Sequence, residues 1–192
     1  MGNREDLLAG AKRCLYDKGY ARTTARDIAT ASGVSLAAIG YHFGSKEALL
    51  NAALEHAIEE WGDDLARLLA EEAASDADPA TRFAATWDKV VQSFATTGPL
   101  WAVQFELLAH VQRDPALRES FAGATRPARL GLAGLFGHEG DEETALSIGA
   151  FYQAILSGLA AQAMADPAHV PSGRDLLNAV RTVAAGLGAG DT

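Results

Sequence analysis

The chain has 192 residues, enough for one domain with a buried core or for a small module fused to a larger one. Hydrophobic residues make up 48% of the chain and charged residues 21%, which excludes an intrinsically disordered protein. The formal net charge of −9 argues at first against nucleic acid as a partner, because phosphates attract cations.

Helix signals recur along the whole sequence, and no run of β-branched residues alternates with polar ones as a strand would. The 40 alanines favour the same interpretation, since alanine has the highest helix propensity. About nine helices are predicted, over residues 4–18, 24–31, 35–42, 46–74, 79–95, 100–113, 114–136, 142–165 and 172–187. The predicted fold class is all-α, with a small N-terminal domain over residues 1–50 and a larger helical domain over residues 51–192.

Several helix starts carry capping signals. Thr24 with Asp27, and Ser172 with Asp175, have the spacing of a capping box, in which each residue satisfies a backbone N–H group of the other. Further caps are predicted at Ser35, Ser45, Asp78, Asp114 and Asp141.

Glycine and proline mark the interruptions. Gly19 and Gly33 suit the left-handed ends of the first two helices. Residues 97–99, Thr-Gly-Pro, are predicted to separate the fifth helix from the sixth. Pro127 is predicted to kink the helix that contains it.

Residues 24–43 have the pattern of a helix-turn-helix. Ile28 faces inward from the first helix of the pair, Gly33 lies in the tight turn, and Ile39 fills the wedge between the two helices. Such a pair places its second helix in the major groove of DNA while its first helix crosses the backbone.

Here the sequence resembles the TetR family of transcriptional regulators, over roughly residues 5–55. The matching residues are Gly19-Tyr20, Thr23-Thr24, Ile28-Ala29, Gly33-Val34-Ser35, Tyr41-His42-Phe43, Lys46-Glu47 and Leu49. The resemblance implies a DNA-binding domain that reads a palindromic operator, and a larger domain that forms a homodimer and holds a small-molecule effector. The implied function is a repressor of transcription that its effector releases from DNA.

One departure from the family pattern falls in the second helix of the pair. Position 40 is glycine where the family often has tyrosine, and position 37 is alanine where glycine is common. A glycine inside a helix costs about 1 kcal/mol relative to alanine. Gly40 therefore removes an aromatic contact and either allows close approach to the phosphate backbone or marks a subgroup.

The DNA-contacting residues are assigned by their chemistry. Those able to donate hydrogen bonds or positive charge to phosphates are Thr24, Ser35, Tyr41, His42, Lys46, Arg22 and Arg26. Those at the start of the reading helix are Leu36, Ala37 and Ala38, which suit thymine methyl groups. With no Asn, Gln or Arg among these three, specificity is predicted to rely on DNA shape, water and phosphate register.

The larger domain is rich in aromatic residues, which line either a core or an apolar ligand pocket. The candidate pocket residues are Trp61, Trp87, Phe94, Trp101, Phe105, His110, Phe121 and Phe151. Glu106 and His110 stand four residues apart and are a candidate hydrogen-bonded pair. No further metal ligand accompanies them, so neither a metal nor another cofactor is predicted.

The last two helices carry apolar stripes that suit a dimer interface made as a four-helix bundle. The candidate interface residues are Tyr152, Ile155, Leu159, Leu177 and Val180. Residues 144–165 hold no charge and are long enough to span a bilayer, but their alanine, glycine and polar content favours a buried helix instead. No membrane association is therefore predicted.

Two other classes of function fit the sequence less well than a regulator. An enzyme would need a phosphate loop or a catalytic arrangement in a recognisable context, and none is found in the sequence. A helical protein-interaction adaptor, or a regulator without an effector, remains the alternative. The N-terminus has no apolar signal segment, which indicates a cytoplasmic protein, and Cys14 lies on an apolar helix face as a buried thiol would.

The net charge is unevenly distributed. Residues 1–56 hold seven Lys and Arg against six Asp and Glu, a net charge of +1, while residues 57–192 hold nine against nineteen, a net charge of −10. The acidity therefore belongs to the larger domain and does not oppose DNA binding by the smaller one.

Overall fold

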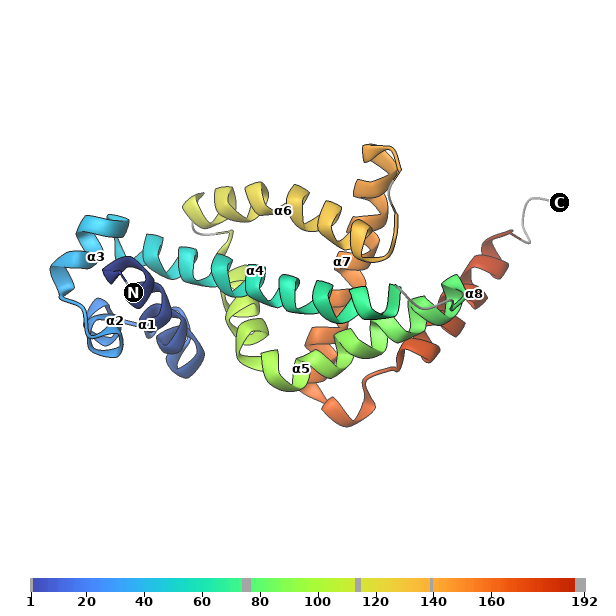
Figure 1. Ribbon diagram of the computed structural model, residues 1–192, viewed down its shortest axis with the longest axis horizontal. Coiled ribbons are helices and arrows are strands. Elements are labelled where there is room, and N and C mark those ends of the chain that lie inside the picture. The colour runs from blue at the N-terminus through green and yellow to red at the C-terminus, as the bar shows by residue number, and fades with distance from the viewer. Residues whose placement is uncertain (1, 74–76, 113–114, 139, 189–192) are drawn as a thin grey trace. The chain divides into compact units, whose positions relative to one another are not determined.

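The computed structural model describes residues 2–73, 77–112, 115–138 and 140–188 (Figure 1). These residues form eight α-helices and one 3-10 turn, with no strand among them, which confirms the all-α prediction. The elements are α1 (Asn3–Lys18), α2 (Ala25–Ser32), α3 (Leu36–Phe43), α4 (Lys46–Ala73), α5 (Pro79–His110), α6 (Pro115–Leu135), α7 (Glu142–Ala165), η1 (Pro167–His169) and α8 (Gly173–Gly188). The predicted cap at Asp114 and the helix end at Arg113 lie outside the described residues.

The predicted break at residues 97–99 is wrong. α5 continues through Pro99 as a single helix, so the described chain has one α-helix fewer than predicted. Proline removes one backbone donor from the helix, but Leu100, Trp101 and Val103 directly after it are buried. Burial of these side chains outweighs the local cost of the proline. Pro127 likewise lies inside the continuous helix α6.

Most predicted caps are confirmed. The Ser172 N–H donates to Asp175 Oδ2 (3.0 Å), and the Asp175 N–H donates to Ser172 Oγ (3.2 Å). Backbone N–H groups also donate to the side chains of Ser45, Asp78 and Asp141. Ser35 is the exception, because it occupies the N-cap position of α3 without a side-chain capping bond.

The chain divides into two compact units. The first comprises Met1–Asp63 and Thr97–Arg118, and the second comprises Asp64–Thr96 and Glu119–Thr192. The first unit thus includes the C-terminal part of α5, from Thr97, and the domain boundary at residue 50 stays a prediction. The division within α5 falls at Thr97, two residues before Pro99.

In the first unit, α1, α2 and α3 pack together (Figure 1). The residues that α1 to α4 bury most completely are Leu7, Ala11, Leu15, Ile28, Leu49 and Leu50. Cys14 is buried with them, as predicted, and burial raises the pKa of its thiol. A close approach holds α1 against α2, since a Cβ atom on Gly10 would lie 2.7 Å from the Cβ of Ser32.

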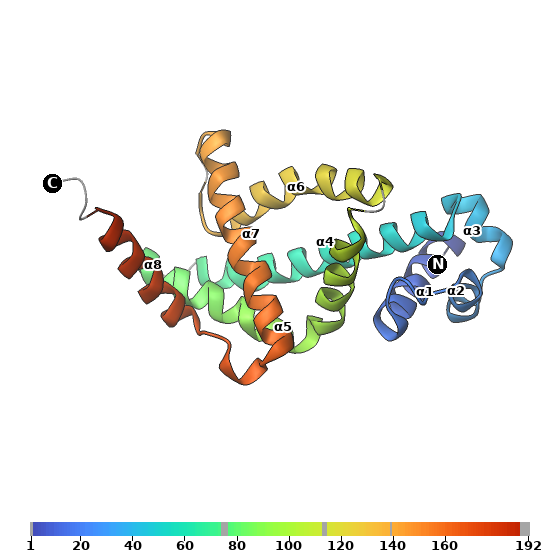
Figure 2. The same ribbon diagram turned by 180° about the vertical axis from the view of Figure 1, so that it is seen from behind.

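In the second unit, α7 crosses the C-terminal part of α6 (Figure 2). Gly149 on α7 faces the backbone carbonyl of Arg129 on α6, with no space for a side chain. Where α8 begins, the Gly173 N–H donates to Asp88 Oδ1 on α5 (2.7 Å). The core of this unit includes Trp87, Tyr152 and Leu156.

α7 is long and apolar enough to cross a membrane, judged by length and composition alone. A third of its most apolar stretch is buried within the single chain, where Ala145, Gly149 and Leu159 belong to the packed face.

Candidate nucleic-acid interface

The start of α2 is fixed by the predicted capping box. The Thr24 N–H donates to Asp27 Oδ2 (2.9 Å), and the Asp27 N–H donates to Thr24 Oγ1 (3.2 Å). Lys18 Nζ lies 2.5 Å from Asp27 Oδ1. The Lys18 ammonium, followed by the Thr24 hydroxyl and N–H, holds the pKa of the Asp27 carboxyl well below its usual range. The Asp27 carboxylate is thus ionised, and its negative charge is compensated by the Lys18 ammonium.

The turn between α2 and α3 depends on a glycine. Gly33 is left-handed, with φ of 72°, and its N–H donates to the Ala29 carbonyl (3.0 Å). A side chain would be strained in this conformation. The turn fixes the direction of α3, which buries Ile39 towards α1 and α2.

The opposite face of α3 is exposed and has no charged side chain. It consists of Leu36, Ala37, Gly40 and Tyr41, and the Tyr41 side chain is 85% exposed. A Cβ atom on Gly40 would meet no atom within 4 Å, so no contact inside the chain requires glycine there. An apolar helix face held outward by a buried opposite face has the geometry of a groove-reading helix.

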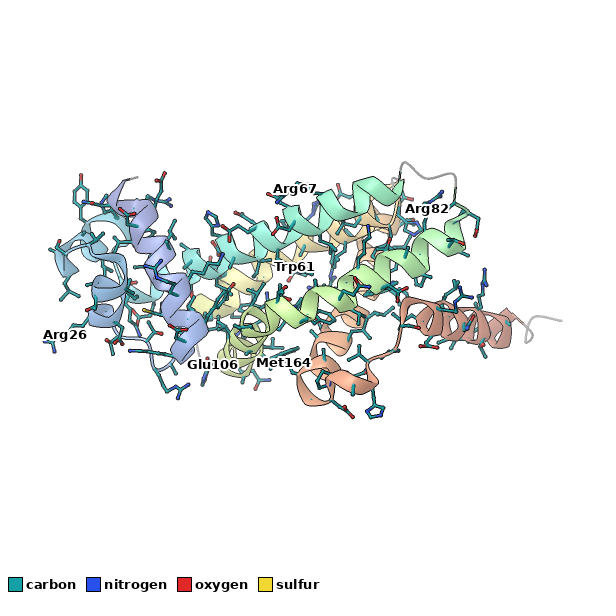
Figure 3. All side chains as sticks on the ribbon, turned by 60° about the horizontal axis from the view of Figure 1, so that its bottom comes forward. Arg26, Trp61, Arg67, Arg82, Glu106 and Met164 are labelled. Carbon is teal, nitrogen blue, oxygen red and sulfur yellow. The ribbon has the colours of Figure 1, made fainter. Side chains whose placement is uncertain are left out.

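The side chains predicted to bind phosphates differ in the hydrogen bonds and ion pairs that they make within the chain. Arg22 Nε donates to the Lys18 carbonyl (2.7 Å), whereas Arg26 is exposed and projects outward from α2 (Figure 3). Lys46 Nζ donates to the Thr23 carbonyl (3.1 Å) and lies 3.3 Å from Glu47 Oε1. Lys46 therefore has to release or share these partners when it contacts a phosphate.

The remaining predicted contacts divide between exposed and half-buried positions. Thr24 and Ser35 are exposed, while Ala38 is half-buried beside Ile39. His42 is half-buried, with its ring edge-on to Tyr41 at a centroid distance of 4.9 Å. The first unit thus brings all ten predicted DNA-contacting residues into α2, α3 and the segments that flank them.

A link that the sequence prediction missed joins this region to α5. The Tyr20 N–H donates to Glu106 Oε2 and the Ala21 N–H donates to Glu106 Oε1, both at 2.9 Å (Figure 3). Gly19 gives the carboxylate room, since a Cβ atom there would lie 2.6 Å from Glu106 Oε2. These bonds replace the predicted pair of Glu106 with His110, which is not found among the described residues.

The predicted pocket residues are distributed over both units. Trp61, Trp101, Phe105 and His110 belong to the first unit, and Trp87, Phe94, Phe121 and Phe151 to the second. In the first unit the Trp61 and Trp101 rings meet edge to face, 5.4 Å apart, and join α4 to α5. Trp87 and Phe94 are buried, as core residues are.

The predicted interface residues face inward to different extents. Tyr152 and Leu159 on α7 are only 6% and 2% exposed within a single chain, so they offer little area to a second copy. Ile155, Leu177 and Val180 are half-buried. The large apolar residues that α7 and α8 leave exposed are Phe151, Met164, Val183 and Leu187.

Comparison with known proteins finds similar sequences for the N-terminal helices. Residues 7–53 match the sequence model of the bacterial regulatory proteins of the tetR family. The HTH-type transcriptional regulator TtgR of Pseudomonas putida is 41% identical over 76 residues, which cover 40% of this chain and 35% of TtgR. The HTH-type transcriptional repressor AcnR of Corynebacterium efficiens is 42% identical over 52 residues, 27% of this chain and 28% of AcnR.

The matched segments span about a third of the length of these curated relatives. A crystal structure of a TetR transcription regulator from Haloarcula marismortui superimposes over 96% of this chain and 95% of its own, with a TM-score of 0.64. Its sequence identity is 22%, so this likeness concerns the fold.

Proposed function

We propose that the chain is a transcriptional regulator of the TetR family, which represses transcription as a DNA-bound dimer that a small molecule releases; the match of residues 7–53 to the family model and the similarity to TtgR support this proposal. The observation that carries the proposal is the outward face of α3. There Tyr41 is almost fully exposed beside Leu36, while Ile39 on the other side anchors the helix. A helix face so presented contributes nothing to the core and suits the major groove.

The chemistry of α3 indicates how a site would be read. Leu36 and Ala37 offer apolar contacts to thymine methyl groups and no bidentate hydrogen bonds to bases. Thr24, Tyr41 and Lys46 supply hydrogen-bond donors for phosphates on either side of the helix. The net charge of +1 over residues 1–56 is small, so affinity depends on a few placed contacts and on dimer geometry.

A dimer supplies the second reading helix that an operator with two half-sites requires. We propose that the subunits join through the exposed side of α7 and through α8. Val183 and Leu187 on α8 are 62% and 77% exposed, and Phe151 on α7 is half exposed. Each of these side chains offers apolar area of the kind that homodimers bury.

Effector binding in the larger part of the chain is proposed to favour a state in which the two reading helices no longer fit the operator. α5 is the element suited to carry the change. It extends from the second unit into the first, where Glu106 holds the segment before α2. A displacement of α5 would therefore act directly on the backbone that positions the helix-turn-helix.

The test of this function is binding to the DNA upstream of the protein's own gene, followed by gel shift or fluorescence anisotropy. We expect salt-sensitive binding that prefers this fragment to shuffled DNA of the same length, with two chains bound per site. Equal affinity for the shuffled fragment, there and at neighbouring genes, would contradict the proposal.

Lys46→Ala should weaken binding to every DNA sequence and flatten the plot of log affinity against log salt concentration by about one unit for each bound subunit, or about two units for the dimer. One phosphate contact contributes roughly 0.9 of a released counterion. Lys12→Ala is the matched control, because Lys12 pairs with Glu60 on a different surface of the same unit. An unchanged slope for Lys46→Ala would show that Lys46 contacts no phosphate.

Tyr41→Ala should lower operator affinity about tenfold, or 1.4 kcal/mol, without changing the free energy of unfolding by more than about 0.5 kcal/mol. The reason is that Tyr41 is 85% exposed and supports little of the core. Tyr41→Phe tests the hydroxyl alone, because it keeps the ring. If the hydroxyl contacts a phosphate, Tyr41→Phe should lose most of the operator affinity that Tyr41→Ala loses. If Tyr41→Ala bound the operator with wild-type affinity, Tyr41 would not contact DNA.

A further inference from the structure

The second unit contains a cavity of about 750 Å³ that the function above leaves unassigned. It lies between the first turns of α5, the end of α6, the middle of α7 and the middle of α8. None of the eight aromatic and histidine residues predicted for a pocket lines it, whereas three of the predicted interface residues do: Tyr152, Leu177 and Val180. Its volume lies within the range of cavities that hold small organic molecules.

One wall of the cavity is aromatic. The rings of Phe136 and Tyr152 are stacked, with centroids 4.0 Å apart and an angle of 22° between their planes. Phe83 lies 5.9 Å from Phe136, and Trp87 packs behind the same ring at 5.2 Å. The wall thus packs against the buried Trp87, and its aromatic surface suits contact with a planar aromatic ring.

The polar groups of the cavity favour an anion. Arg82 is the lining residue with a permanent positive charge, and no described lining residue is an aspartate or a glutamate. The Arg82 guanidinium donates one hydrogen bond, from Nη1 to the Ala77 carbonyl (2.5 Å), which leaves further N–H donors for a ligand. His138 Nε2 lies 3.0 Å from the Tyr152 hydroxyl and adds a second polar group.

The local charge of the cavity is opposite to that of its surroundings. Residues 57–192 carry a net charge of −10, which by itself would favour a cationic ligand. No carboxylate is among the described lining residues, so at contact distance the single arginine outweighs distant acidic groups, because exposed charges are screened beyond about 10 Å. The residues that line the cavity, and not the net charge of the domain, therefore determine the charge of the ligand that it prefers.

We propose that this cavity binds a planar aromatic molecule with one anionic group, its ring against Phe136 and Tyr152 and its anion at Arg82. The proposal rests on the function proposed above in one respect, that such a molecule would be the effector. Leu177 and Val180 would cover the ligand from α8, so binding would change the packing of the helix assigned to the dimer contact.

The test uses two probes that differ in one group. 1-Anilinonaphthalene-8-sulfonate carries the sulfonate, and N-phenyl-1-naphthylamine is the same aromatic molecule without it. Both are titrated into full-length protein by fluorescence, with stoichiometry from calorimetry. Arg82→Gln removes the cavity's permanent charge, and Arg67→Gln is the matched control on another exposed arginine of the same unit, paired with Asp64 outside the lining (Figure 3).

We expect one sulfonate probe per chain, bound about tenfold more weakly by Arg82→Gln and unchanged in Arg67→Gln, because a charge-assisted pair is lost. The uncharged probe should bind both variants like the wild type. Wild-type sulfonate binding by Arg82→Gln, or equal effects of the two substitutions, would overturn the proposal. Equal melting temperatures of the variants show that neither loss comes from unfolding.

Failure of the proposed function gives a different result. DNA binding is measured on the same proteins without a probe. A lack of operator preference in that measurement would contradict the proposed function, and it would leave the fluorescence result on the cavity unchanged. Displacement of the wild-type protein from its operator by the sulfonate probe, reduced in Arg82→Gln, is expected if the cavity is the effector site. Arg82-dependent binding that leaves operator affinity unchanged would support the cavity and contradict its role in release.

Discussion

A Gly149→Ala variant should unfold with a free energy about 3 kcal/mol lower than that of the wild type. Gly149 is buried where α7 crosses α6, and an added Cβ atom would overlap the backbone carbonyl of Arg129. Backbone atoms cannot rotate aside as a flexible side chain can. The two helices must therefore separate, and the Arg129–Gln153 hydrogen bond beside the crossing (3.1 Å) would be strained with them.

Urea unfolding followed by circular dichroism measures this loss. Gly131→Ala on α6 is the control, because Gly131 is exposed and a Cβ atom there would meet no atom within 4 Å. It should stabilise the protein by up to about 1 kcal/mol through helix propensity alone. If Gly149→Ala were as stable as Gly131→Ala, the close crossing of α6 and α7 would be wrong.

Glu106→Gln should lower operator affinity at least tenfold. The wild-type carboxylate accepts hydrogen bonds from two neighbouring backbone amides, those of Tyr20 and Ala21. A glutamine has one acceptor oxygen, and its amide group turns an N–H donor towards another donor. Loss of a hydrogen bond to a charged group costs roughly 1.5–3 kcal/mol, and an unsatisfied donor adds to that cost.

Amide hydrogen exchange distinguishes this role from general destabilisation. The Tyr20 and Ala21 amides should exchange about tenfold to a hundredfold faster in Glu106→Gln, while amides in the core of the second unit keep their protection. Glu59→Gln, at an exposed position on α4, should leave both exchange and operator affinity unchanged. Wild-type protection of Tyr20 and Ala21 in the Glu106 variant would contradict the link.

The features that the sequence predicted well are local. The capping boxes at Thr24 and Ser172 depend on residues three positions apart, and the left-handed Gly33 depends on its own backbone. The inward position of Ile28 and Ile39 follows from helical periodicity in short helices. For this reason the helix-turn-helix could be placed from residues 24–43 alone.

The features that it missed depend on residues far apart in the chain. The four-residue spacing on one helix predicts that Glu106 pairs with His110, yet the partners of Glu106 lie 85 and 86 residues away. The continuity of α5 through Pro99 depends on burial of the residues that follow it. No short-range pattern contains either kind of information.

The aromatic residues of the larger part show a related difficulty. Periodicity shows which side chains share a helix face, but it does not show which neighbouring element that face contacts. The apolar stripe of its helix predicts a dimer contact for Tyr152, yet within one chain Tyr152 is buried against Phe136, and burial raises the pKa of its hydroxyl. Phe83 and Phe136, which line the cavity, were not distinguished from ordinary core residues by any sequence signal.

The continuity of α5 also constrains how its length can change. Trp101 and Glu106 lie five residues apart on this helix, within the first unit. There the Trp101 ring meets Trp61, and Glu106 accepts hydrogen bonds from the Tyr20 and Ala21 amides. Each residue turns the helix by about 100°, so inserting or deleting one residue between Trp101 and Glu106 would turn one of these contacts away from its partner. Substitutions between the two preserve their angular phase, whereas a change in length destroys it.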